Sequence, residues 1–242
     1  MTAWKSWKIA QKEFKVTRRK KSVISYVVAL PLLLTVFFTL VVKNDFASGI
    51  SSNYQLGFES LTFFYVVFAA IVPSSLAAYS IVGEKVEKSL EPLLATPVSD
   101  DEILLGKSIA AFLPSIVSIW VGASIFMAAT DVLTHNSLSF YYFPNRNAAI
   151  MLFLLAPLAA ITSIELAVIV SSRVTDVRGA NQFASLMFVP FMVVFVSAVE
   201  GAFPFSISNL LIFSLLVLVA DIALFRLSRS IFKREEILTK WK

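Results

Sequence analysis

The stretch Gly83–Lys107, GEKVEKSLEPLLATPVSDDEILLGK, is the only long charged interval inside an otherwise apolar chain. Hydrophobic residues make up 57% of the 242 residues, charged residues make up 15%, and the mean hydropathy is +0.79. This balance is typical of an integral membrane protein and excludes an ordinary soluble domain. The charged interval is therefore expected to lie outside the bilayer, where another protein can contact it.

Six apolar runs flank this interval, two before it and four after it. A membrane-spanning helix needs about 20 predominantly apolar residues, and each run is close to that length. The runs cover residues 23–42, 61–82, 108–130, 148–170, 180–199 and 207–227. The sequence therefore predicts an all-α integral membrane protein, with six transmembrane helices in a single domain over residues 1–242.

The positions of Lys and Arg predict the orientation of these helices. Of the 21 Lys and Arg residues, 19 lie before the first run, between the second and third, between the fourth and fifth, or after the sixth. Because cytoplasmic segments carry the excess of Lys and Arg, both termini and residues 83–107 are expected in the cytoplasm. The net charge of +5 thus reflects membrane topology rather than nucleic-acid binding, although anionic lipid would attract the same residues.

Residues 2–20 are predicted to form an amphipathic helix before the first span. One face carries Trp4, Trp7, Ala10, Phe14 and Thr17 at three- and four-residue steps, and the opposite side carries Lys5, Lys8, Lys12, Lys15 and Arg19. Trp combined with basic residues suits the headgroup boundary, so we expect the helix to lie on the inner leaflet. The alternative is a helix that packs on a partner protein through its apolar face.

The charged interval contains signals for two helices. Ser99 followed by Glu102 forms a capping box, which predicts that the third long helix begins at Asp100 and projects into the cytoplasm before it enters the lipid. Upstream, Ser89 can cap a short helix that ends near Pro97. Its three leucines, Leu90, Leu93 and Leu94, share one face. That apolar face either folds back on the helix ends or enters a groove on a partner, and the residues alone leave both open.

The interval closely resembles the cytoplasmic loop of type-2 ATP-binding-cassette (ABC) transporter permeases, which commonly reads ERERGTLELLLATPVSR-EILLGK. This sequence departs from that pattern at Lys88, Ser89 and Pro92. Three further segments resemble the same family, namely KEF at residues 12–14, SSRVTDVRGANQ at 171–182 and FKREEIL at 232–238. Together with the six runs, the resemblance covers essentially the whole chain.

The resemblance implies that the loop forms a coupling helix between spans 2 and 3, which docks on a separate ABC ATPase subunit. It also implies a permease in the cell membrane, expected to be an exporter, that pairs with a second permease chain as a homodimer or heterodimer and works with two ATPase copies. ATP and Mg would bind to those partners. The residues assigned to coupling are Glu84, Glu87, Leu90, Glu91, Leu93, Leu94, Thr96 and Pro97. The resemblance does not identify the substrate.

The chain itself carries no recognisable catalytic or metal motif. The GKS at residues 106–108 is not a phosphate-binding loop, because the required glycine is replaced by Asp101 and the segment leads into a membrane helix. The absence of cysteine excludes thiolate metal sites. The single histidine, His135, is expected to be a solvated side chain in an outer loop. The chain is thus predicted to be a transport subunit without enzymatic activity or a cofactor of its own.

If the family's usual dimer arrangement applies, the second and fifth spans are the candidates for lining a substrate path. Their side chains for this role are Ser75, Tyr79, Phe188, Phe191, Met192 and Phe195. Soft aromatic and Met-rich surfaces suit varied apolar ligands. Lipid contact or helix packing explains the same aromatic stripe.

Two acids, Glu165 and Asp221, lie inside predicted spans, where an ionisable group costs about 2.5 to 3.5 kcal/mol on insertion scales. Pairing with, or snorkelling towards, Arg173 and Arg226 is one explanation. The other is a proton relay in a proton-coupled secondary transporter. A third class of function, a non-transporting membrane scaffold that recruits a protein through residues 83–107, is also compatible with the sequence.

Each of the first five spans contains one proline, which frees a backbone carbonyl and permits a kink. These are Pro31, Pro73, Pro114, Pro157 and Pro190. They are either hinges for alternating access or fixed features of static helix packing.

Overall fold

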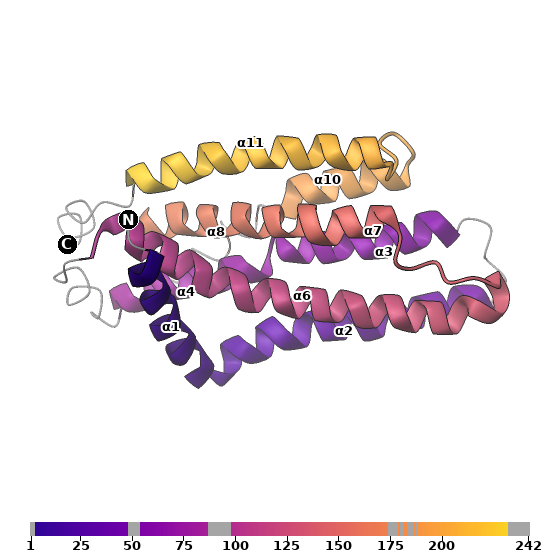
Figure 1. Ribbon diagram of the computed structural model, residues 1–242, viewed down its shortest axis with the longest axis horizontal. Coiled ribbons are helices and arrows are strands. Elements are labelled where there is room, and N and C mark those ends of the chain that lie inside the picture. Colours follow the sequence, from indigo (N-terminus) through magenta and orange to yellow (C-terminus); the bar gives the residue numbers. More distant parts are fainter. Residues whose placement is uncertain are drawn as a thin grey trace.

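The computed structural model describes residues 3–47, 54–86, 98–173 and 188–231, together with the single residues 179, 182 and 186. In this part of the chain the regular structure is entirely helical, and the long helices run side by side (Figure 1). The elements are α1 (Ala3–Arg19), α2 (Lys21–Ala47), α3 (Tyr54–Ala69), α4 (Val72–Val86), α6 (Asp100–Leu138), α7 (Arg146–Ile150), η1 (Met151–Leu155), α8 (Ala156–Arg173), α10 (Phe188–Val199) and α11 (Ile207–Ile231). The α1 end of the bundle is defined here by α1, the end of α4 and the start of α6, and the opposite end is called the far end.

Within the described ranges, five helical stretches are long and apolar enough to cross a membrane. They are Val23–Phe46, Tyr54–Ser80, Asp100–Leu138, Arg146–Ser171 and Ile207–Ile231. Four of the predicted runs lie wholly inside these stretches, and the second span begins at Tyr54 instead of residue 61. The fifth predicted span, 180–199, is represented by the 12-residue helix α10 and by a preceding part that lies largely outside the described residues. A multi-pass membrane protein is thus confirmed, while the count of six spans remains a prediction.

The second span is interrupted rather than continuous. A turn at residues 70–71 separates α3 from α4, and Pro73 is the second residue of α4. Because proline has no N–H, it cannot donate to the carbonyl of Ala69, and its fixed φ suits the first turn of a new helix. The Ser74 hydroxyl donates to the carbonyl of Ile71 at 2.6 Å and so supports the turn. Pro73 therefore marks a real break in the helix.

The fourth span contains a π-helical turn, η1, between α7 and α8. The backbone N–H of Ala156 donates to the carbonyl of Met151, five residues earlier. The next residue, Pro157, has no N–H to offer to the carbonyl of Leu152. The indole N–H of Trp120 on α6 donates to that carbonyl at 2.7 Å instead. A side chain from another span thus satisfies the acceptor that the proline leaves free.

Helix α6 is the longest element, with 39 residues. The predicted capping box is present: the N–H of Glu102 donates to Ser99 Oγ at 3.3 Å, and the N–H of Ser99 donates to Glu102 Oε2 at 3.1 Å. The helix continues eight residues beyond the predicted end at Thr130, to Leu138, and closes at Ser139 with a φ of 63°. At 1.5 Å per residue it is about 58 Å long, well beyond the roughly 30 Å of a hydrocarbon core.

The extension of α6 corrects the prediction for His135. This residue lies in the last turn of the helix and not in a loop. Its ring stacks on Tyr141, with 4.5 Å between the ring centroids and an interplanar angle of 14°. The apolar run predicts an end at Thr130 because polar residues follow it. Contacts with the segment after the helix, such as the stacking of His135 on Tyr141, instead extend the helix to Leu138.

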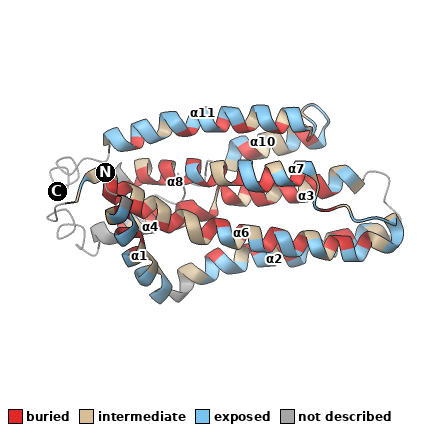
Figure 2. Cartoon of the chain, in the orientation of Figure 1, coloured by how far each residue is buried: buried red, intermediate tan, exposed pale blue. Residues whose placement is uncertain are grey.

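Burial divides the helices into central and peripheral ones (Figure 2). In the apolar window of the second span 72% of residues are buried, against 22% in each of α2 and α11. Large apolar side chains on the peripheral helices are exposed, for example Leu33 at 67% and Leu216 at 62%. Because a membrane helix needs no polar surface towards lipid, these faces are expected to contact acyl chains.

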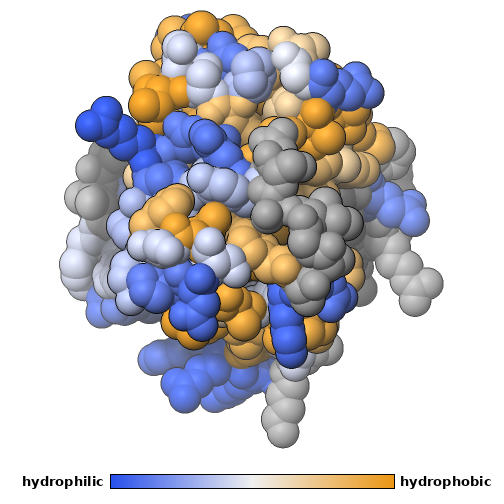
Figure 3. Space-filling view, turned by 90° about the vertical axis from the view of Figure 1, so that its right-hand side faces the viewer, coloured by the Kyte–Doolittle hydropathy of each residue, from blue (hydrophilic) through white to orange (hydrophobic). Residues whose placement is uncertain are grey.

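Polar contacts join the elements at the far end, where hydrophilic and hydrophobic side chains mix on the surface (Figure 3). The Glu59 carboxylate accepts from the Asn147 amide at 2.8 Å and from the Tyr142 hydroxyl at 3.2 Å. The same amide donates to the carbonyl of Phe205 at 2.6 Å, which ties α7 to the turn before α11. Burial, together with the neighbouring Glu59 carboxylate, raises the pKa of Tyr142, so its hydroxyl stays a donor.

Candidate functional site

The predicted coupling segment lies mostly outside the described residues. Glu84 is in the last turn of α4, and the structure does not describe its side chain. The remaining coupling candidates, Glu87, Leu90, Glu91, Leu93, Leu94, Thr96 and Pro97, fall in the undescribed range 87–97. What the structure does describe is the two flanks, because α4 ends at Val86 and α6 begins at Asp100, both at the α1 end (Figure 1). The site is therefore built from these flanks and from the helix packed against them.

Helix α1 packs against α6 through a face that the sequence did not reveal. Its buried residues are Ser6, Ile9, Ala10 and Glu13. Of the predicted aromatic face, Trp4 (68%) and Trp7 (41%) are exposed, whereas Phe14 and Thr17 are half-buried and Ala10 is buried. The amphipathic helix is thus confirmed, but a third face, between the aromatic and basic ones, holds it on its own chain. The tryptophans remain available to a membrane surface.

Gly106 allows the close approach of α1 to α6. A Cβ at this position would lie 2.7 Å from Ile9 Cβ and 2.8 Å from the carbonyl oxygen of Ser6. Real Cβ atoms do not come that close to other heavy atoms, so any larger residue would push the two helices apart. The glycine of the LLGK motif is therefore a packing residue for α1.

The next residue, Lys107, joins three helices through one buried polar cluster. Its ammonium group donates to Glu13 Oε1 at 3.3 Å and to the carbonyl and hydroxyl oxygens of Ser80, both at 2.9 Å. The Ser80 hydroxyl in turn donates to Glu13 Oε2 at 3.0 Å. Lys107 is 2% exposed and Glu13 is 4% exposed. Each group in this Glu13–Ser80–Lys107 cluster has a partner, as a buried ion pair requires.

The local sequence patterns did not predict this cluster, although both of its charged residues lie in segments that resemble the permease family. Glu13 is the centre of KEF, and Lys107 is the end of EILLGK. Each was assigned to its own local segment, because the spacing along the chain gives no sign that the two meet. The available signal was that both charges lie where a helix approaches the apolar region, where an unpaired charge is costly.

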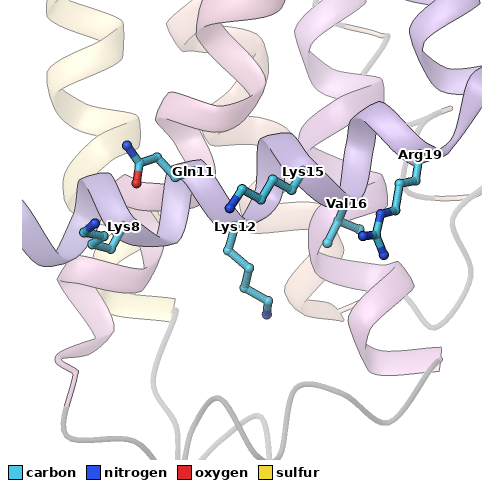
Figure 4. A pocket seen from close by; sticks show the side chains of 6 residues that line it. All are labelled: Lys8, Gln11, Lys12, Lys15, Val16 and Arg19. Atoms are coloured by element: carbon cyan, nitrogen blue, oxygen red, sulfur yellow. The ribbon is translucent and has the colours of Figure 1, made fainter.

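Two cavities line the exposed side of α1. One, of about 410 Å³, is bordered by the α1 residues Lys8, Gln11, Lys12, Lys15, Val16 and Arg19 (Figure 4). The other, of about 400 Å³, lies between α1 and Val98, the first described residue after the coupling segment. Trp4 and Ile9 contribute to its wall. Val98, two residues before the start of α6, thus lies beside α1.

The predicted path residues lie in two separate environments. On α4, Ser75 is half-buried, and the Tyr79 hydroxyl accepts a hydrogen bond from the Lys20 ammonium group. On α10, Phe191 is buried and packs edge-to-face on Phe213 of α11, with ring centroids 5.5 Å apart. Phe195 lies 4.6 Å from Phe64 of α3 by the same measure. The partly buried Phe188 and Met192 join the same hydrophobic core.

These contacts support helix packing for the aromatic stripe within one chain. The assignment of these side chains to a substrate path remains a prediction.

Glu165 on α8 and Asp221 on α11 lie inside the bundle near its α1 end. They are 7% and 5% exposed, and the Thr162 hydroxyl donates to Asp221 Oδ1. In the described part of the chain, Glu165 Oε2 and Asp221 Oδ2 are buried without a hydrogen-bond partner. Arg226 is exposed and forms no ion pair with either acid there, so the proposed pairing with Arg226 is corrected. The side chain of Arg173 lies outside what the structure describes.

Comparison with known proteins supports the resemblance drawn from the sequence. Residues 7–211 match the model of the ABC-2 family transporter proteins. The matched range runs from α1 to the start of α11, and so it contains the Glu13–Ser80–Lys107 cluster and the whole charged interval. Among curated proteins, none matches the chain.

Proposed function

Because the chain belongs to the ABC-2 family of transporter proteins, we propose that it is the permease subunit of an ABC exporter, driven by ATP that a separate subunit hydrolyses. The observation that carries this proposal is the family match over residues 7–211, which includes the loop resembling a coupling segment. Both flanks of that loop emerge at the same end of the bundle (Figure 1). An external ATPase would thus reach both ends of the segment at once.

In the proposed arrangement the α1 end faces the cytoplasm of a cell membrane. Segments that hold 19 of the 21 Lys and Arg residues are then on the cytoplasmic side. The exposed Trp4 and Trp7 lie at the headgroup level, where aromatic residues are favoured. Two such chains, as a homodimer or heterodimer, pair around the substrate path and bind two ATPase subunits that hold ATP and Mg.

Force passes from the ATPase through residues 84–97 to the helices on either side. Closure of the ATPase sites displaces the coupling segment, and α4 and α6 receive the displacement directly. The Glu13–Ser80–Lys107 cluster ties α1 to both helices, so these three elements move together. The break before Pro73 lies between α4 and α3, where a rigid-body displacement can be absorbed.

Affinity purification of the tagged chain from its native cells tests this proposal. The wild-type chain is expected to bring down an ATPase with nucleotide-binding motifs, and Leu93→Asp or Leu94→Asp is expected to lose it, because a charge cannot enter an apolar groove. Arg229→Ala is the matched control, since it removes an exposed ion pair with Asp101 at the same end, outside the coupling residues 84–97. Retention of the ATPase by both Leu variants, or purified chain that moves substrate without any ATPase, would contradict the proposal.

A proton-coupled carrier is the second candidate, because two buried acids with unpartnered oxygens are also what a proton relay needs. It predicts transport driven by a pH gradient in vesicles that contain this chain alone, and loss of that transport in Glu165→Gln. A non-transporting scaffold, the third class, would recruit a cytoplasmic protein through residues 83–107 and would move no substrate with or without an ATPase. Reconstitution with and without the ATPase separates the three.

A further inference from the structure

An apolar cavity of about 270 Å³ lies between α6, α8 and α11, near the α1 end. Its walls include Leu105, Ile109 and Phe112 from α6, and Ile161 and Ile164 from α8. A single acid, Glu165, also lines it. The cavity thus combines a hydrophobic wall with one carboxyl group, which is the composition of a site for an amphipathic small molecule.

A second cavity, of about 220 Å³, adjoins the first and adds the other acid. Both cavities share Glu165 and Phe225, and the second reaches Asp221 and Arg226. Within the described residues, the Glu165 and Asp221 side chains each keep one buried oxygen without a partner. Both acids therefore line the second cavity, from two different helices.

The unpartnered oxygens distinguish this pair from the other buried acids of the described chain. Glu13 is paired with Lys107, and Glu59 accepts from Asn147 and Tyr142. A buried carboxyl group without a partner costs free energy, and two carboxylates that share one space repel each other. Thr162 supplies one donor to Asp221 and leaves the remaining acceptors open. Arg226 lines the second cavity but forms no ion pair with either acid within the described residues, so a donor that carries positive charge would complete the pair.

We propose that Glu165 and Asp221 bind the ammonium group of a monovalent organic cation whose apolar body fills the cavity between α6, α8 and α11. A primary ammonium has three N–H donors and one positive charge, which suits two carboxyl groups with free oxygens. A divalent metal fits less well, because Ca²⁺ takes six to eight oxygen ligands and Mg²⁺ requires octahedral coordination. The hydrophobic walls favour an organic ligand over a hydrated ion.

The position of the cavity suggests how such a ligand reaches it. Helix α11 forms one wall and is peripheral, with most of its apolar surface exposed. Amphipathic cations partition into the headgroup region of a bilayer, from which this wall is accessible. The idea that such a cation is the exported substrate rests on the proposed function. The binding of the cation to the cavity is independent of that function.

Fluorescence titration with dansylcadaverine, which joins a naphthalene ring system to a primary ammonium, tests the site. The chain is held in lipid nanodiscs without any ATPase, and empty nanodiscs give the background. The N-acetylated probe, which lacks the charge, is the matched ligand control. Glu165→Gln and Asp221→Asn are each expected to weaken binding of the ammonium probe at least tenfold. Glu200→Gln, at an exposed acid on the far end, is expected to bind like the wild-type chain.

A second variant tests the cavity without changing the acids. Ile161→Trp fills the apolar part and is expected to weaken binding of the ammonium probe while the chain elutes as a single species in size-exclusion chromatography. Equal affinity for the charged and acetylated probes, or unchanged affinity in Glu165→Gln and Ile161→Trp, would overturn the proposal. Because no ATPase is present, a negative result here leaves the permease function standing. Failure to find an ATPase by purification would leave this site standing.

Discussion

Two groups of buried charged residues lie at the same end of the bundle and differ in one respect. In the Glu13–Ser80–Lys107 cluster every side chain has a partner, and the cluster joins α1, α4 and α6. In the Glu165–Asp221 pair, Asp221 accepts a hydrogen bond from Thr162. Within the described residues, one buried oxygen of each acid has no hydrogen-bond partner. The first group is complete without a ligand, and the second is not.

This difference indicates different roles. A fully satisfied polar network in a low-dielectric interior fixes a unique arrangement, and removing one member leaves a charge without compensation. An incomplete pair already carries this free-energy cost in the chain without a ligand. A ligand that supplies the opposite charge would lower that cost. Stability measurements should therefore respond strongly to changes in the cluster and weakly to changes in the pair.

The largest effect is expected for Lys107→Met, which leaves the Glu13 carboxylate buried and unpaired. Breaking a buried ion pair by removing one partner costs about 3 to 5 kcal/mol. The free energy of unfolding, measured by denaturant titration in micelles, should fall by that amount. Arg229→Ala, which breaks the exposed pair with Asp101, is the control and should cost less than about 1 kcal/mol. Similar losses of unfolding free energy in both variants would show that the buried cluster contributes no more to stability than an exposed ion pair.

Gly106→Ala comes next, because its methyl group would collide with Ile9 Cβ and the carbonyl oxygen of Ser6. Overpacking of this kind typically costs about 1 to 3 kcal/mol. Gly57→Ala on α3 is the matched control, since no atom lies within 4 Å of the added methyl group and alanine favours a helix. We expect limited proteolysis to release α1 from Gly106→Ala and not from Gly57→Ala. Equal protection of the two variants would argue against close packing of α1 on α6.

A smaller effect is expected for Trp120→Phe. The substitution removes the indole N–H that satisfies the carbonyl of Leu152, next to the π-helical turn. Loss of one buried hydrogen bond costs on the order of 1 kcal/mol, and most of the ring packing is retained. Hydrogen exchange at η1 should become faster in the variant, while exchange in α11 stays the same. Unchanged exchange at η1 would mean that another group satisfies this carbonyl.

The smallest change in stability is expected for Glu165→Gln, which should be neutral or slightly stabilising because it removes a buried, unpartnered acid. Glu13→Gln at the other group should instead destabilise, since it leaves Lys107 without its counter-charge. Thermal unfolding of the two variants, side by side, compares the two regions directly. A large loss of stability in Glu165→Gln would contradict the distinction between them.

The sequence predicted features that depend on local patterns. Apolar runs located the spans because the thickness of the bilayer sets the length of a spanning helix. The Ser99–Glu102 spacing located the start of α6 because a capping box is formed within four residues. The contacts between distant segments were not predictable. Nothing in the spacing of Glu13 and Lys107, 94 residues apart, shows that they pair.

Helix ends on the far side were also missed, for the same reason. The extension of α6 to Leu138 depends on contacts such as the stacking of His135 on Tyr141, and polarity alone gives no measure of them. The early start of the second span at Tyr54 likewise depends on packing of the Phe58 ring against Tyr142, at 5.1 Å between centroids. Local hydropathy located the spans, and tertiary packing determined how far the helices continue.

The central claim, that the chain moves in response to ATP hydrolysed by another subunit, can be tested by spin-label distances. The chain has no cysteine, so Lys15→Cys on α1 and Leu215→Cys on α11 give two unique labels, diluted into unlabelled chain so that distances within one chain dominate. The distance between them is predicted to change when trapped nucleotide is added to the complex with the ATPase, and to stay constant in Leu93→Asp. A change with the chain alone, or no change in the complex, would contradict the account.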